Sequence, residues 1–132
     1  MLYDIFVSIP VPHNRTEENP RPVTARLNFT AGMLSAAGEK GVLTTFGPAI
    51  IWNTVNNLVA LTGGLSAAYV NPHEYGNAHI GGPLQFLSHI AVETKITGGL
   101  GVGYYFQHLS NANLYFHNPG MNLNSFSLSY HF

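Results

Sequence analysis

The end of the chain, residues 125–132, alternates apolar and polar residues up to a terminal aromatic residue. The apolar positions are Phe126, Leu128, Tyr130 and Phe132. Because successive side chains of a strand point to opposite faces, this segment predicts a strand with one apolar and one polar face. A strand of this kind that ends on an aromatic residue is typical of a bacterial outer-membrane β-barrel and rare in a soluble sandwich. The segment therefore favours a barrel.

Composition supports that class. Charged residues make up 8% of the 132 residues, against roughly 25% in an ordinary soluble domain. No run of about 18 apolar residues is present, which excludes a membrane-spanning helix. Low charge without such a helix fits a barrel, whose strands hide their hydrophobicity in alternation. The length predicts one domain over 1–132.

The same counts exclude other classes. The formal net charge of −1 argues against a nucleic-acid partner, which needs a basic face. The absence of cysteine removes disulfide and thiolate chemistry. The N-terminal residues Met1-Leu2-Tyr3-Asp4 carry no signal-peptide pattern. Since an exported protein needs one, we expect a mature form or a chain that lacks part of its natural N-terminus.

Seven segments read as strands because turn residues such as Gly, Pro and Asn separate them. They are expected over 2–10, 22–36, 42–53, 57–70, 83–96, 98–110 and 122–132. Single-chain bacterial barrels have an even number of strands, so seven leaves one unaccounted for. We expect the eighth to be missing from the N-terminus or to arise by splitting the segment 22–36.

The alternation is clearest in the sixth segment. Leu100, Val102, Tyr104 and Phe106 share one face, and glycines with Gln107 lie between them. Across the segments the polar face is rich in Gly, Ser, Thr and Asn, which suits a narrow barrel interior better than a surface in water. Four charged residues on that face sum to zero and are expected to pair inside: Asp4, Arg26, Glu93 and Lys95. Four aromatic residues near strand ends are candidates for interface girdles: Trp52, Tyr69, Tyr104 and Tyr105.

Three polar residues fall on the face expected to meet lipid. His108 and Ser110 are two apart on one strand, so they share the face of Phe106, and Asn122 shares the face of Phe126. If the two strands pair through the loop 111–121, the three residues meet near one membrane interface. A serine beside a histidine is the minimum for nucleophilic acyl transfer, in which a third group orients the imidazole. The alternative is that these residues have no catalytic role and are polar because they lie at the end of a strand that meets water.

The segment His108-Leu109-Ser110-Asn111-Ala112, a loop that ends in Asn118-Pro119-Gly120 and the terminal aromatic strand together resemble the lipid A 3-O-deacylase family. The resemblance extends upstream through Phe46-Gly47-Pro48 and 82–90, and its spacing covers about 22–132. It implies an eight-stranded outer-membrane barrel that cleaves the ester-linked acyl chain at position 3 of lipid A. It also implies an active site on the outer wall, facing lipid.

Carried over by position, Ser110 matches the family nucleophile and His108 the general base. Asn111 matches the residue whose side chain helps to hold the oxyanion. The family's third member is a Glu twelve residues after the serine, where this chain has Asn122. An amide can orient the imidazole but supplies no full charge, so a lower rate is expected. Glu74 could replace that Glu only if its loop folds over the site; Glu93 is expected to face the interior.

The leading hypothesis is therefore an outer-membrane serine esterase of the lipid A 3-O-deacylase type. No cofactor is implied and no metal site is expected, because the histidines lack a ligand spacing. The expected partners are lipid A or lipopolysaccharide and outer-membrane lipid; a homodimer or association with another membrane protein stays open. The main alternative is a non-catalytic barrel that serves as a structural or interaction subunit. A soluble small-barrel ligand carrier is the third reading.

Overall fold

The computed structural model describes residues 2–11, 23–54, 58–72, 74–97 and 99–130. Among these residues every regular element is a strand. The strands are β1 (Leu2–Pro10), β2 (Val23–Ala36), β3 (Glu39–Asn53), β4 (Val59–Asn71), β5 (Glu74–Tyr75), β6 (Ala78–His79), β7 (Leu84–Thr97), β8 (Leu100–Ser110) and β9 (Met121–Tyr130).

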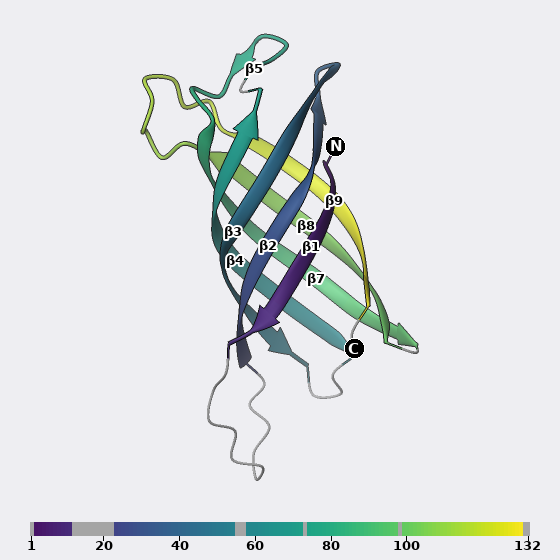
Figure 1. Cartoon of the computed structure of the whole chain (residues 1–132). Coiled ribbons are helices and arrows are strands. Elements are labelled where there is room, and N and C mark those ends of the chain that lie inside the picture. Colours follow the sequence, from purple (N-terminus) through teal and green to yellow (C-terminus); the bar gives the residue numbers. More distant parts are fainter. Residues whose placement is uncertain (1, 12–22, 55–57, 73, 98, 131–132) are drawn as a thin grey trace.

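Seven of these strands form one antiparallel sheet in the order β1-β2-β3-β4-β7-β8-β9, which curves around an interior (Figure 1). Each strand pairs with the next long strand along the chain, so the sheet is an up-and-down meander. Two residues connect β2 to β3. Ala37 and Gly38 both have positive φ, 51° and 84°, as the favoured two-residue hairpin turn requires.

The seven predicted strands are confirmed, with ends that shift by up to three residues. The expectation that 22–36 splits into two strands is wrong, because β2 is continuous and pairs with β3 along its whole length. The sequence analysis missed β5 and β6, a two-stranded hairpin within the expected loop 71–82. Residues 131–132, which complete the terminal aromatic pattern, lie outside the described residues.

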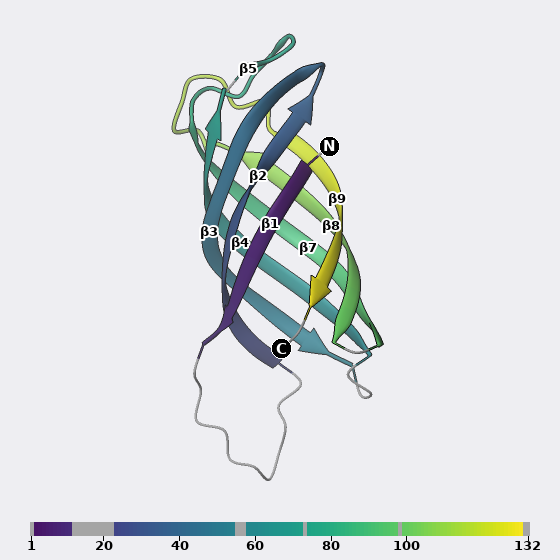
Figure 2. The same ribbon diagram turned by 45° about the vertical axis from the view of Figure 1, so that its right-hand side comes forward.

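The two edge strands, β1 and β9, run in the same direction (Figure 2), as the first and last strands of a seven-stranded meander must. Within the described residues no ladder joins them. A closed meander of antiparallel neighbours needs an even number of strands. The seven strands of this sheet therefore form a strongly curved, open sheet.

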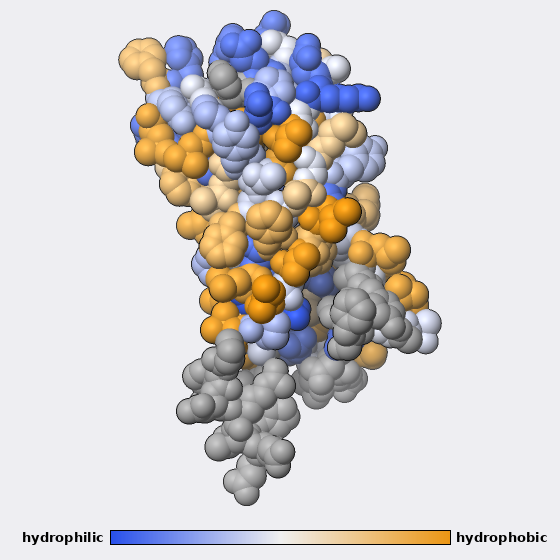
Figure 3. All heavy atoms as spheres, viewed as in Figure 1, coloured by the Kyte–Doolittle hydropathy of each residue, from blue (hydrophilic) through white to orange (hydrophobic). Residues whose placement is uncertain are grey.

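The outer face of the sheet is apolar. Exposed aliphatic and aromatic side chains project from every strand of the sheet, and on the face seen in Figure 3 hydrophobic residues gather over the middle of the molecule. Residues at the end that carries β5 and β6 are more hydrophilic in the same view. No helix long and apolar enough to cross a membrane is found among the described residues. Trp52, Tyr69 and Tyr104 are exposed on the outer face, whereas Tyr105 points into the interior and cannot belong to a girdle.

The interior has an apolar layer at the end that carries β5 and β6. Each of the seven strands places a buried aliphatic residue in this layer, β4 places a second, Ala68, and the hairpin segment adds two further residues. The others are Leu2, Leu34, Leu43, Val70, Leu87, Leu109 and Leu123, with Tyr75 and Ile80. Burial raises the pKa of Tyr75, whose side chain is held in this layer. The layer fixes the hairpin to the strand ends that carry His108 and Ser110.

Beyond this layer the interior is polar. Glu93 accepts hydrogen bonds from the hydroxyl of Tyr105, at 2.6 Å, and from that of Thr62, at 3.1 Å. The expected ion pairs are not found: within the described residues no ion pair joins Asp4, Arg26, Glu93 and Lys95. The hydroxyls of Tyr105 and Thr62 are instead the hydrogen-bond partners of the half-buried Glu93 carboxylate, and Lys95 is exposed.

Candidate functional site

His108 and Ser110 lie at the end of β8, and Asn122 lies at the start of β9. His108 is paired directly with Asn122 across the two strands. His108 and Asn122 are exposed, and Ser110 is half-buried. Leu109, which lies between His108 and Ser110 in the chain, points into the core. The outward placement predicted from the alternation is confirmed for these residues. The strand register, set by the loop 111–120, brings them to one end of the sheet.

A hydrogen bond connects His108 to Asn122. The distance from Nδ1 of His108 to Oδ1 of Asn122 is 2.7 Å. A carbonyl oxygen only accepts, so Nδ1 carries the proton in this arrangement and Nε2 presents its lone pair. That tautomer is the one a general base needs, because Nε2 is then free to take a proton from a hydroxyl.

Ser110 lies two residues from His108 on the same face, opposite Phe86 of β7. Within the described contacts no hydrogen bond joins the Ser110 hydroxyl to the imidazole. Catalytic hydrogen bonds are often long in a protein without substrate and shorten in the complex. The structure thus brings His108 and Asn122 together and leaves Ser110 beside them on the same wall.

Asn111, expected at the oxyanion, is fully buried. Its amide nitrogen donates to the carbonyls of Ile80, at 3.0 Å, and His117, at 2.6 Å. Its Oδ1 accepts from the backbone N–H of Asn113, at 2.9 Å. Both N–H groups of the side chain are therefore in use, and Asn111 connects the β5–β6 segment to the loop 111–120.

Among the residues that the structure describes, no glutamate takes the place of the family's carboxylate beside His108. Glu93 faces the interior, as predicted from its parity, and is bonded to Tyr105 and Thr62. Glu74 lies on the β5–β6 hairpin, where its Oε1 is 3.2 Å from Nδ1 of His79. Among the described contacts, the side-chain partner of His108 is the neutral amide of Asn122.

Two neighbours of His108 were missed by sequence reasoning. Ser88 on β7 is paired with His108 from the other side, and its hydroxyl donates to the His108 carbonyl at 3.4 Å. Gly120 has a φ of 67°, and a Cβ placed there would lie 3.0 Å from Cε1 of the imidazole. The register of β7 against β8 reveals Ser88, and the conformation of the loop 111–120 reveals Gly120; neither can be read from the sequence.

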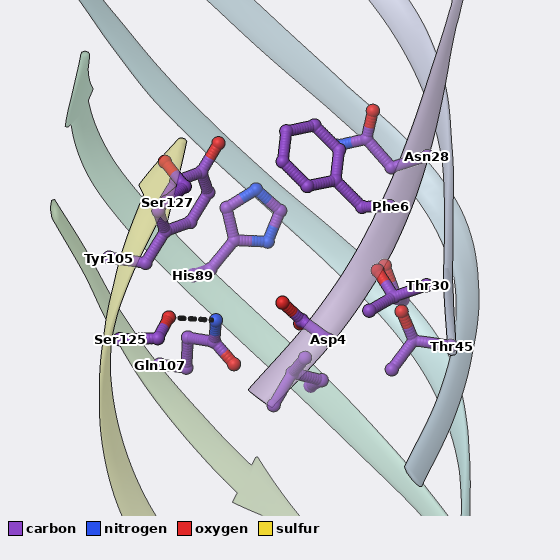
Figure 4. Close-up of a pocket in the computed structure, with 12 residues that line it drawn as sticks. Asp4, Phe6, Asn28, Thr30, Thr45, His89, Tyr105, Gln107, Ser125 and Ser127 are labelled. Carbon is purple, nitrogen blue, oxygen red and sulfur yellow. Dashed lines mark hydrogen bonds between the residues drawn. The ribbon is translucent and has the colours of Figure 1, made fainter. Parts of the chain in front are cut away.

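The interior contains a separate small cavity of about 40 Å³, lined by residues of all seven strands (Figure 4). His89 projects into it between Phe6 and Tyr105, and Gln107 donates to the hydroxyl of Ser125 at 3.2 Å. A space of this size holds only a few water molecules. No group of three His, Cys, Asp or Glu residues suited to a metal ion occurs in the part of the chain that the structure describes.

Chemically, the outer wall offers an oriented imidazole with a free lone pair, a neighbouring hydroxyl and an apolar surface. A general base beside an alcohol can transfer an acyl group from an ester through a covalent intermediate. Because the residues face outward at a strand end, they suit an ester carried at the boundary between an apolar phase and water.

Comparison with known proteins adds two findings. Residues 15–131 match the family described as Lipid A 3-O-deacylase (PagL). Among solved structures, the chain is similar to one described as the crystal structure of the outer membrane enzyme PagL, with a TM-score of 0.78 and 19% sequence identity. That alignment covers 96% of this chain and 87% of the other, which shows a shared fold. No curated protein matches the chain.

Proposed function

The chain belongs to the lipid A 3-O-deacylase family, and from that premise we propose that it is a serine esterase that removes the ester-linked 3-hydroxyacyl chain at position 3 of lipid A. The observation that supports this most is the 2.7 Å bond between His108 and Asn122 beside Ser110, on a wall that is mainly apolar. An oriented imidazole next to a hydroxyl has no packing role on such a wall.

In the proposed reaction, Oγ of Ser110 attacks the ester carbonyl while Nε2 of His108 takes the hydroxyl proton. The tetrahedral intermediate collapses as the imidazolium returns that proton to the departing sugar oxygen, which leaves the acyl chain on Ser110. Water, activated by His108, then releases the 3-hydroxy fatty acid and restores the serine. Asn122 keeps the imidazole in the required tautomer throughout.

Stabilisation of the oxyanion is assigned to Asn111 by its place after Ser110. Because both N–H groups of its side chain are bonded to the carbonyls of Ile80 and His117, one of these bonds must open for the side chain to serve. Its backbone N–H is also bonded, to Oδ1 of Asn118 at 3.0 Å. A local change in the loop 111–120 during the reaction is therefore part of this proposal.

We place the chain in the bacterial outer membrane as a single domain over 1–132, with the apolar face of the sheet in contact with lipid. Strand β8 is eleven residues long, close to the roughly 9–11 residues that a tilted membrane strand needs. Ser110 ends this strand, so an ester linkage between sugar and acyl chain meets the hydroxyl at the edge of the apolar wall.

The second candidate is a barrel of the same family without catalysis, serving as a structural or interaction subunit. Two observations favour it: Asn122 stands where the family has a Glu, and among the described contacts no hydrogen bond joins Ser110 to His108. It predicts that a folded, isolated chain turns over no ester.

Two serine substitutions test the proposal. Ser110→Ala should abolish hydrolysis of the p-nitrophenyl ester of a 3-hydroxy fatty acid by the detergent-refolded chain, since it removes the nucleophile. Ser88→Ala is the matched control: Ser88 also neighbours His108 on the outer face, but its hydroxyl is bonded to a backbone carbonyl. It should keep about the parent rate.

Retained activity in the Ser110→Ala variant, or its loss in Ser88→Ala alone, would assign the nucleophile elsewhere. Reaction of Ser110 with a fluorophosphonate probe, read by mass spectrometry, gives an independent check.

A further inference from the structure

A second cavity lies beside the candidate site, at the end of the sheet that carries β5 and β6. It has a volume of about 370 Å³. It is lined by Glu74, His79, Gly81, Phe116 and His117. Two segments thus form its walls: the hairpin with the residues after it, and the loop 111–120.

The walls of this loop cavity are held together directly behind Ser110. Asn111, the next residue, donates from its buried amide to the carbonyls of Ile80 and His117, one on each wall. The hydroxyl of Tyr115 accepts a hydrogen bond from the backbone N–H of Leu84 at 3.3 Å. In the substrate-free structure these bonds hold the loop cavity next to Asn111, the residue that follows Ser110.

The lining of the loop cavity combines an aromatic ring with carboxylate and imidazole groups. Phe116 is 100% exposed, and the centre of its ring is 5.3 Å from that of His117. Glu74 and His79 form a pair 3.2 Å apart. A bare phenyl ring in water is unfavourable, so a ligand that covers it would gain apolar contact.

This chemistry fits a saccharide. The C–H face of a pyranose ring covers a phenyl ring, while its hydroxyls donate to a carboxylate and exchange hydrogen bonds with imidazoles. A phosphate group fits less well, because the carboxylate of Glu74 would repel it.

We propose that the loop cavity binds the saccharide head group of the lipid whose ester Ser110 attacks; this inference rests on the proposed function. The order of the surfaces matches the order of groups in such a lipid. The polar loop cavity holds the sugar, Ser110 meets the ester at the end of β8, and the outward row that includes Phe106 and Tyr104 contacts the acyl chain.

Two substrates separate head-group binding from chemistry. We compare kcat/KM of the refolded full chain for lipid A and for the p-nitrophenyl ester of a 3-hydroxy fatty acid, which has no sugar. Phe116→Ala should lower the ratio of lipid A to p-nitrophenyl ester turnover about tenfold, the equivalent of one lost aromatic contact. Glu74→Ala should lower the same ratio.

Leu114→Ala is the control, because Leu114 is exposed on the same loop but does not line the cavity. It should leave the ratio unchanged. An equal loss on both substrates in Phe116→Ala, or no loss on either, would overturn the saccharide site.

Binding of lipid A to the Ser110→Ala protein tests the cavity without turnover. Adding Phe116→Ala should weaken that binding about tenfold, and unchanged binding would overturn the inference. If the parent hydrolyses neither substrate while Phe116→Ala still weakens binding, the proposed function fails and the saccharide site stands.

Discussion

At His108, orientation and charge are separate requirements, and Asn122 meets only the first. Its Oδ1 fixes the tautomer from 2.7 Å away, but it offers no negative charge to the imidazolium that would form in the proposed reaction when Ser110 loses its proton. A hydrogen bond to a charged group contributes about 1.5–3 kcal/mol, against roughly 1 kcal/mol for a neutral one. The smaller contribution of the neutral bond predicts that His108 acts as a general base but at a reduced rate.

Asn122→Glu should therefore raise kcat, by roughly tenfold for about 1.4 kcal/mol of added stabilisation. Asn122→Leu, of similar size but without an acceptor, should lower kcat because the imidazole loses its orientation. Both are measured as p-nitrophenyl ester turnover by refolded protein. An Asn122→Glu variant no faster than the parent would mean that charge at this position does not limit the reaction.

Gly120 keeps the edge of the imidazole open. A methyl group there would lie 3.0 Å from Cε1 and 3.4 Å from Nε2 of His108, on the side where the base must work. Gly120→Ala should lower kcat/KM by about tenfold or more.

Gly38→Ala is the matched control for Gly120→Ala. Its φ of 84° imposes a similar backbone cost, about 1 kcal/mol, but nothing lies within 4 Å of the added Cβ. Equal activity losses in the two variants would show that backbone strain, and not access to His108, accounts for the effect.

At the scale of the strands, lipid contact makes a prediction that a water-soluble sheet does not. Ile90 and Ile96 of β7 are 66% and 61% exposed; Ile90 lies near the middle of the strand and Ile96 near its end, at a bulge against β8. In a bilayer, Ile90→Arg should cost about 2–4 kcal/mol of unfolding free energy and Ile96→Arg about 0–1 kcal/mol. Urea unfolding of the chain in lipid vesicles measures both. Two equally small costs would place this face in water.

The strands were largely predictable from the sequence, because apolar and polar residues alternate along a strand whose sheet has one apolar and one polar face. The β5–β6 hairpin was not, since strands of two residues carry no period. Nor was the inner apolar layer: Leu43, Leu109 and Leu123 occupy the face that elsewhere reads as polar. The fold explains why these leucines are buried, because the ends of the seven strands meet around Tyr75.

The site was partly predictable. Parity placed His108 and Asn122 on the outer face, and their direct pairing across β8 and β9 produced the bond. The sequence did not reveal that Asn111 turns inward, because the carbonyls of Ile80 and His117 that attract its amide come from segments 31 and 6 residues away. Side-chain roles at a strand end depend on such non-local partners.

At the scale of the whole molecule, three zones follow one another along the outer surface: a polar end with the loop cavity, the boundary with Ser110, and the apolar wall. A glycolipid has the same order of groups, with a polar head group at one end and an apolar chain at the other. The family assignment and the fold agree with that arrangement.

The most direct test is mass spectrometry of lipid A after incubation with the detergent-refolded chain and, in parallel, with Ser110→Ala. The parent should remove one 3-hydroxyacyl chain, and Ser110→Ala should remove none. Intact lipid A after incubation with a demonstrably folded parent, or deacylation by Ser110→Ala, would contradict the proposed function.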